Sequence, residues 1–126
     1  MKINIPKIKW TLAEIKTDAD IINYMYPLED VIYKIHGVSV EKGIEELLFI
    51  GHSKQLATTL LHHWDAIERK ESPFTGYENL NFYYVSIKIL TWKSIGNALV
   101  YDSSQLKNIE IRLIDFYKPH FNLLLF

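Results

Sequence analysis

The pattern of hydrophobic runs predicts two neighbouring strands early in the chain. Residues 31–35 (VIYKI) and 46–51 (ELLFIG) are rich in β-branched, aromatic and aliphatic residues, and the second run closes on a glycine. The segment between them, 36–43, contains two glycines. We therefore expect two antiparallel strands joined by a long hairpin. A third run, 81–90, alternates over most of its length and predicts a half-buried third strand.

Three further segments have the spacing of helices. The first follows a capping run at 17–20 and stops before Pro27. The second is expected to begin with Ser53 as its cap, and the third follows 102–104 and ends at Pro119. The side chains expected to face inward are Leu56, Leu60, Leu61, Trp64 and Ile67 in the second helix, and Leu106, Ile109, Leu113, Ile114 and Tyr117 in the third.

The order of these elements indicates an α+β fold. With a short helix over 92–100, the core reads strand, strand, helix, strand, helix, helix, which predicts a small three-stranded antiparallel sheet flanked by helices. No repeat, low-complexity segment or linker rich in Gly, Ser or Pro divides the 126 residues. We expect a single domain, with a core over 29–126 and an N-terminal segment, 1–28, packed on it.

Composition narrows the classes of protein. A hydrophobic content of 48% suffices for one packed core, and the lack of cysteine excludes disulfides, thiolate nucleophiles and cysteine-based zinc sites. No apolar run reaches the roughly 18 residues of a membrane helix, so we expect no membrane contact and a cytoplasmic location. Because the net charge is −1, any contact with nucleic acid must come from a local patch. The basic candidates are Lys2, Lys7, Lys9, Lys107, Arg112 and Lys118.

Short motifs in a fixed order carry the functional signal. They are VIY at 31–33, FIG at 49–51, a helix with His63, then Glu110 and KPHFN at 118–122. In this order the chain resembles the GIY-YIG nuclease superfamily as a divergent member, over most of its length. The resemblance implies a metal-dependent DNA endonuclease that hydrolyses phosphodiester bonds with Mg²⁺ or Mn²⁺. It leaves RNA open as an alternative substrate.

The resemblance implies a role for three residues. Tyr33 falls on the first motif's tyrosine and is a candidate general base, whereas a half-buried strand tyrosine is the structural alternative. Glu110, nine residues before Pro119, matches the metal-binding glutamate; the alternative is a solvent-facing helix residue. His63 matches a histidine that would bind phosphate or relay a proton. Together Tyr33, His63 and Glu110 are the candidate catalytic residues.

Candidate substrate contacts lie between these positions. Gly51 matches the motif glycine, and Gln55, Thr59 and His63 are spaced along one helix face, which would suit either a site or a solvated surface. Thr59 stands where the family has its catalytic arginine. Lys54, five positions earlier, is also a candidate, although five helical residues diverge by about 140°.

Two substitutions set the competing hypotheses. Phe49 stands in place of the second motif's tyrosine, and we expect this phenylalanine to have a core role. Thr59 stands in place of the arginine, and its neutral hydroxyl cannot replace a guanidinium. Loss of that charged group lowers the rate on the order of a hundredfold. One hypothesis is an endonuclease of weakened or altered activity. The other is a catalytically inactive module that binds nucleic acid or a protein partner. In both, a partner or a homo-oligomer would supply specificity. A zinc site is not expected, because adjacent His62 and His63 diverge by about 100° on a helix.

Overall fold

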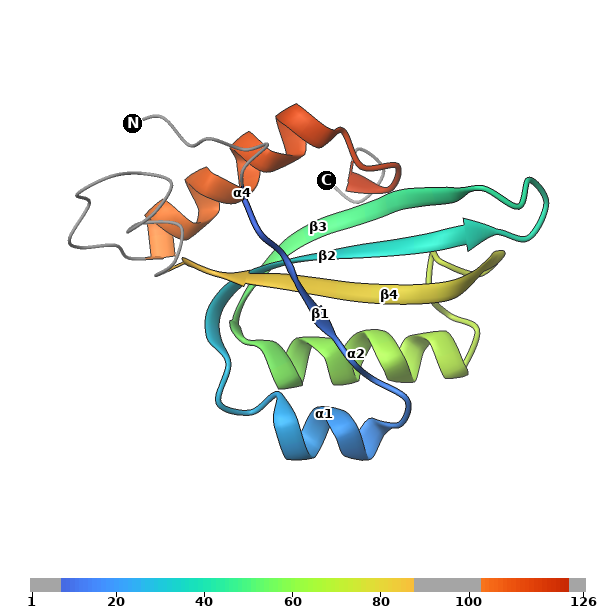
Figure 1. Ribbon diagram of the computed structural model, residues 1–126, viewed down its shortest axis with the longest axis horizontal. Coiled ribbons are helices and arrows are strands. Elements are labelled where there is room, and N and C mark those ends of the chain that lie inside the picture. The colour runs from blue at the N-terminus through green and yellow to red at the C-terminus, as the bar shows by residue number, and fades with distance from the viewer. Residues whose placement is uncertain (1–7, 88–102, 123–126) are drawn as a thin grey trace.

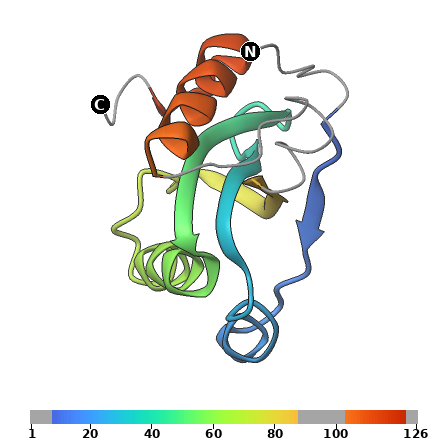
Figure 2. The same cartoon turned by 90° about the vertical axis from the view of Figure 1, so that its left-hand side faces the viewer.

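A four-stranded antiparallel sheet lies at the centre of the protein. The computed structural model describes residues 8–87 and 103–122. Within them the strands lie in the order β1-β4-β2-β3, with α1 and α2 on one side of the sheet and α4 on the other (Figures 1 and 2). The α+β class is confirmed, but the sheet has four strands instead of the expected three. The bounds are β1 Thr11–Ala13, α1 Asp18–Tyr24, β2 Glu29–Ser39, β3 Glu45–Gln55, α2 Leu56–Glu68, β4 Tyr77–Ser86 and α4 Ser103–Tyr117.

The additional strand comes from the N-terminal segment. β1 pairs antiparallel with β4, with Thr11 opposite Tyr84 and Ala13 opposite Phe82. Three residues are too few to show a periodicity in sequence, so the strand could not be predicted. β4 begins at Tyr77, four residues before the expected start of the third strand, and ends at Ser86. Positions 88–90 of that expected strand lie outside the described residues, as does the expected helix over 92–100.

The loop between β2 and β3 is shorter than expected. β2 continues to Ser39, so most of the segment predicted as a loop is strand. Gly37 suggested a break in the strand but lies within β2. Glycine fits there because Leu48 and Leu80 pack over it, and an added Cβ would lie 2.8 and 2.7 Å from their methyl carbons. The turn itself uses Gly43, at φ +67°, a conformation that favours glycine.

The helices begin and end close to their expected positions, with one exception. In α1 the Asp20 carboxylate accepts a hydrogen bond from the Thr17 N–H at 3.0 Å, and the helix ends before Pro27. In α2 the cap is Gln55, whose Oε1 accepts from the Thr58 N–H at 3.0 Å. The expected cap, Ser53, is wrong, because β3 continues past it.

The sheet separates two apolar cores, because successive strand residues point to opposite faces. Tyr33 belongs to the core on the α2 face and its neighbour Ile32 to the core on the α4 face. Leu56 and Leu60 are buried against the first core, whereas Ile109 and Leu113 are buried against the second. Within the described residues, no helix is long and apolar enough to cross a membrane.

The segment after α4 lies along β3, the edge strand of the sheet. The His120 N–H donates to the Leu47 carbonyl at 3.1 Å and the Phe121 N–H to the Leu48 carbonyl at 2.8 Å. Asn122, which is 1% exposed, completes the contact from its side chain. Its Oδ1 accepts from the Ile50 N–H at 2.8 Å and its Nδ2 donates to the Ile50 carbonyl at 2.7 Å.

Candidate functional site

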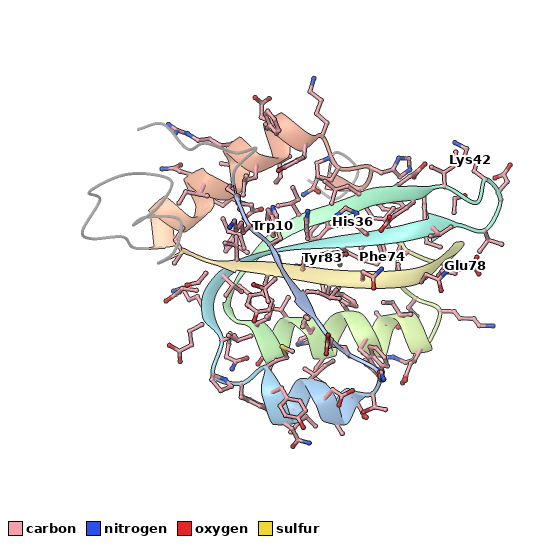
Figure 3. All side chains as sticks on the ribbon, in the orientation of Figure 1. Trp10, His36, Lys42, Phe74, Glu78 and Tyr83 are labelled. Atoms are coloured by element: carbon pink, nitrogen blue, oxygen red, sulfur yellow. The ribbon has the colours of Figure 1, made fainter. Side chains whose placement is uncertain are left out.

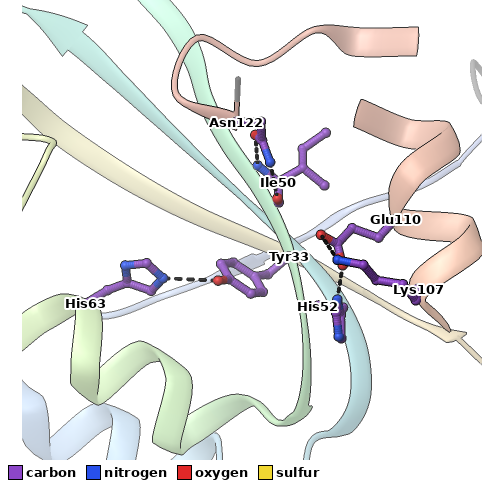
Figure 4. Close-up of polar contacts among 7 residues, drawn as sticks. All are labelled: Tyr33, Ile50, His52, His63, Lys107, Glu110 and Asn122. Carbon is purple, nitrogen blue, oxygen red and sulfur yellow. Dashed lines mark hydrogen bonds and ion pairs between the residues drawn. The ribbon is translucent and has the colours of Figure 1, made fainter. Parts of the chain in front are cut away.

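A tyrosine and a histidine meet on the α2 face of the sheet. Tyr33 Oη lies 3.1 Å from His63 Nε2, so β2 and α2 together hold the two side chains in hydrogen-bonding contact (Figure 4). Gly51 lies opposite Tyr33 in the β2–β3 register. A Cβ at Gly51 would lie 2.6 Å from the Tyr33 hydroxyl, so the ring can occupy this position only over a glycine. The structure thus brings three of the expected site residues together.

Burial keeps both members of this pair neutral. Tyr33 is 5% exposed, and desolvation raises the pKa of its hydroxyl. Desolvation, and secondarily the nearby His62, lowers the pKa of His63 to about 4. At neutral pH His63 is therefore uncharged. In the tautomer with its hydrogen on Nδ1, its Nε2 accepts the hydrogen bond of the Tyr33 hydroxyl.

Aromatic rings surround the pair. The Phe49 ring centroid lies 6.0 Å from that of Tyr33 and 6.0 Å from that of His63. Phe74 lies 5.9 Å from His63 by the same measure, and Phe82 6.4 Å. Phe49 therefore packs in the core, as expected of a phenylalanine at this position. These neighbours provide a low dielectric around the pair but no positive charge for a phosphate.

Two of the other expected substrate contacts, Thr59 and Gln55, have partners within the protein. Thr59 Oγ1 lies 2.6 Å from Ser53 Oγ and 3.4 Å from the Gln55 carbonyl. The Gln55 side chain caps α2 and also donates from Nε2 to the Tyr26 carbonyl at 2.5 Å. Lys54 is exposed on β3. The stripe predicted on α2 is thus divided, because Gln55 serves the helix end while Thr59 fastens α2 to β3.

Glu110 lies on the opposite face of the sheet. Its carboxylate is 2% exposed, so the alternative of a solvent-facing residue is wrong. Glu110 Oε2 contacts His52 Nδ1, and Oε1 lies 3.8 Å from Lys107 Nζ (Figure 4). His52 pairs with Ile32 across β2 and β3, whereas Gly51 pairs with Tyr33. Gly51 and His52 are adjacent in β3 and therefore face opposite sides of the sheet. The Tyr33–His63 pair lies on the Gly51 side, and Glu110 lies on the His52 side.

The Glu110 environment fits a divalent cation only in part. Mg²⁺ usually keeps several waters and binds through one or two carboxylates. Glu110 supplies one carboxylate. Burial, with the positive charge of Lys107 as a second cause, lowers the pKa of His52, which keeps its imidazole neutral and able to act as a ligand. Lys107 is itself a cation near the same carboxylate. Among the described residues, no group of three or more His, Cys, Asp or Glu side chains could hold a metal.

His52 and Lys107 are the neighbours of Glu110 that sequence reasoning did not place there. The available signal was the phase of β3, because His52 directly follows Gly51 and so must face the other side of the sheet from Tyr33. No protein-family model, curated protein or solved structure matches the chain. What the protein does must therefore be inferred from its residues and their geometry.

Proposed function

We propose that this protein is a divergent nucleic-acid domain of the GIY-YIG type that hydrolyses DNA phosphodiester bonds weakly, with Mg²⁺ or Mn²⁺. The observation that supports the proposal most is the packing of Tyr33 over Gly51. A tyrosine and a glycine from two short sequence motifs occupy facing positions, and the glycine is required sterically. His63, the third motif residue on this face, lies within hydrogen-bonding distance of the tyrosine.

The Tyr33–His63 pair can take part in proton transfer. While the Tyr33 hydroxyl donates to a neutral His63, its oxygen keeps lone pairs that can accept a hydrogen bond from a water molecule. Glu110 would hold the divalent cation, which when bound neutralises charge on the phosphate and the departing oxygen. RNA remains the alternative substrate, because both nucleic acids carry the same phosphodiester.

Thr59 explains why hydrolysis is expected to be slow. Its hydroxyl is engaged with Ser53 and carries no charge. A preorganised charged donor stabilises a phosphoryl transition state by several kcal/mol, so its loss lowers the rate on the order of a hundredfold or more. Phe49 also lacks the hydroxyl of the tyrosine that it replaces. The predicted enzyme therefore retains a proton-transfer pair and a carboxylate without the expected phosphate clamp.

Cleavage of labelled DNA, with EDTA as the blank, tests the proposal. We expect slow cleavage with Mn²⁺ or Mg²⁺, loss of cleavage in Glu110→Gln and in Tyr33→Phe, and faster cleavage in Thr59→Arg. His62→Gln is the control for Thr59→Arg, because His62 is exposed and lies on the same helix, α2, as Thr59. Circular dichroism would establish that each variant is folded. Cleavage by folded Glu110→Gln at the wild-type rate would refute this site.

A catalytically inactive module is the second candidate, and two observations favour it. Glu110, Thr59 and Gln55 each have partners within the protein, and Glu110 lies across the sheet from Tyr33. Such a domain would bind nucleic acid, a protein partner or a second copy of itself without cleaving. No cleavage by either the wild type or Thr59→Arg would support this candidate. The cytoplasmic location stays a prediction from sequence.

A further inference from the structure

A lysine surrounded by aromatic rings lies on the α4 face of the sheet. Lys34 Nζ is 4.7 Å from the ring centroid of Trp10, 5.2 Å from that of Tyr83 and 5.9 Å from that of Tyr117. The His36 ring meets Tyr83 edge-on, with centroids 5.2 Å apart. We call these five residues the Lys34 patch; Figure 3 labels Trp10, His36 and Tyr83.

The patch is separate from the Tyr33–His63 pair. Lys34 follows Tyr33 directly in β2, so its side chain points to the opposite face. The five side chains come from β2, β4, α4 and the segment before β1, and all five are half-buried. A half-buried ring keeps part of its surface available to a ligand, unlike the buried rings of Phe74 and Phe82 near His63.

The Lys34 charge has no carboxylate partner within 4 Å among the described residues, and the three rings are its close neighbours. Cation–π contact holds an ammonium in place while leaving its charge uncompensated. Glu45, whose charge acts on Lys34 from more than 4 Å away, has its Oε1 3.9 Å from His36 Nδ1. The patch therefore presents an oriented positive charge to an anion.

Two buried polar atoms in the patch also lack partners within the described part of the chain. They are Trp10 Nε1 and His36 Nε2. A buried N–H donor without a partner costs about 1–3 kcal/mol, so such atoms in a folded protein usually meet a water or a ligand. Trp10 contacts Lys34, and His36 contacts Tyr83, which in turn contacts Lys34. Both unpaired atoms thus belong to residues of the Lys34 patch.

A cation set among stackable rings matches the chemistry of an unpaired nucleotide strand. Proteins that bind single strands combine positive charge for phosphates with aromatic side chains on which bases stack. A duplex hides the faces of its bases and would offer only phosphates. We infer that the Lys34 patch binds single-stranded nucleic acid, with a phosphate on Lys34 and bases against Tyr83 and Tyr117. The choice of nucleic acid over other anions rests on the proposed function.

Binding of a labelled oligothymidylate, followed by fluorescence anisotropy in EDTA, tests the inference without cleavage. Lys34→Met keeps an unbranched stem and removes the charge; we expect roughly tenfold weaker binding and a salt dependence lower by about 0.7 in log–log slope. Lys42→Met is the matched control, at the turn after β2 (Figure 3). Tyr83→Phe should bind nearly as the wild type does, whereas Tyr83→Leu should bind roughly fivefold more weakly.

Several results would overturn the inference. These are equal affinities of folded Lys34→Met and Lys42→Met, equal affinity of the wild type for duplex and single strand, or no binding at low salt. Displacement of the strand by millimolar inorganic phosphate alone would also overturn it, because only an isolated anion site would then remain. Binding that depends on Lys34 in a protein that never cleaves DNA would leave the inference standing while the proposed hydrolysis fails.

Discussion

Replacing Gly51 with alanine tests the packing that supports the proposed function. The added Cβ would lie 2.6 Å from Tyr33 Cζ and Oη and 2.8 Å from Cε1, whereas carbon contacts are favourable at about 3.5–4.0 Å. The ring would have to move by roughly 1 Å. Because Tyr33 is buried between Phe49 and His63, it cannot do so without changing its contacts.

The expected loss of stability follows from these contacts. Overpacking of a core costs about 1–3 kcal/mol, and loss of the Tyr33–His63 hydrogen bond adds about 1 kcal/mol. Alanine recovers about 0.5–1 kcal/mol relative to glycine in a strand. We therefore expect Gly51→Ala to lower the free energy of unfolding by about 1–3.5 kcal/mol.

Urea denaturation of a double-mutant cycle isolates this effect. Tyr33→Leu removes the ring atoms that the new Cβ would meet, so in that background Gly51→Ala should be neutral or slightly stabilising. The coupling energy between the two sites should then be about 2 kcal/mol or more. If Gly51→Ala costs the same in the wild type and in the Tyr33→Leu background, or costs less than about 0.5 kcal/mol in the wild type, the steric reasoning is wrong.

Three other changes have expected outcomes. Since His63 has a folded-state pKa of about 4, below its unfolded value, its contribution to stability is complete above about pH 6.5 and is lost as the pH falls toward 4, by about 3 kcal/mol; urea titrations should show this loss in the wild type but not in His63→Leu. Asn122→Ala should cost about 2–4 kcal/mol in the same assay, because two buried backbone hydrogen bonds to Ile50 are lost; a cost below about 1 kcal/mol would contradict this. Gly37→Ala meets only leucine methyl groups at its shortest contacts and should cost about 1 kcal/mol, less than Gly51→Ala; an equal cost would contradict it.

Local chemistry sufficed to predict the central elements of the fold. β2 and β3 follow from their β-branched and aromatic runs, and α2 and α4 from their apolar spacing. β1 depends on pairing with β4, which no local pattern reports. Gly37 misleads because the sequence does not distinguish a glycine that accommodates neighbouring leucines from one that breaks a strand. Ser53 misleads because α2 follows β3 with no loop to separate them.

The candidate site was predictable in composition but not in arrangement. The resemblance named Tyr33, Gly51 and His63 as candidate site residues, but the contact of Tyr33 with Gly51 is visible only in the β2–β3 register. Glu110 is buried beside Ile109, although Ile111 on its other side is 52% exposed. The face of the sheet that Glu110 approaches depends on how α4 docks. The spacing of three residues along α4 brings Lys107 near Glu110, whereas the contact with His52 depends on that docking.

The contact between the C-terminal segment and β3 bears on how the sheet avoids pairing with other chains. An edge strand offers unpaired N–H and C=O groups to any passing strand and so promotes aggregation. Residues 120–122 occupy such groups at Leu47, Leu48 and Ile50. At the other edge, β1 is only three residues long and offers little to pair with. Residues 120–122 thus protect this edge against intermolecular sheet growth, and truncation before residue 120 would leave it free to pair with other chains.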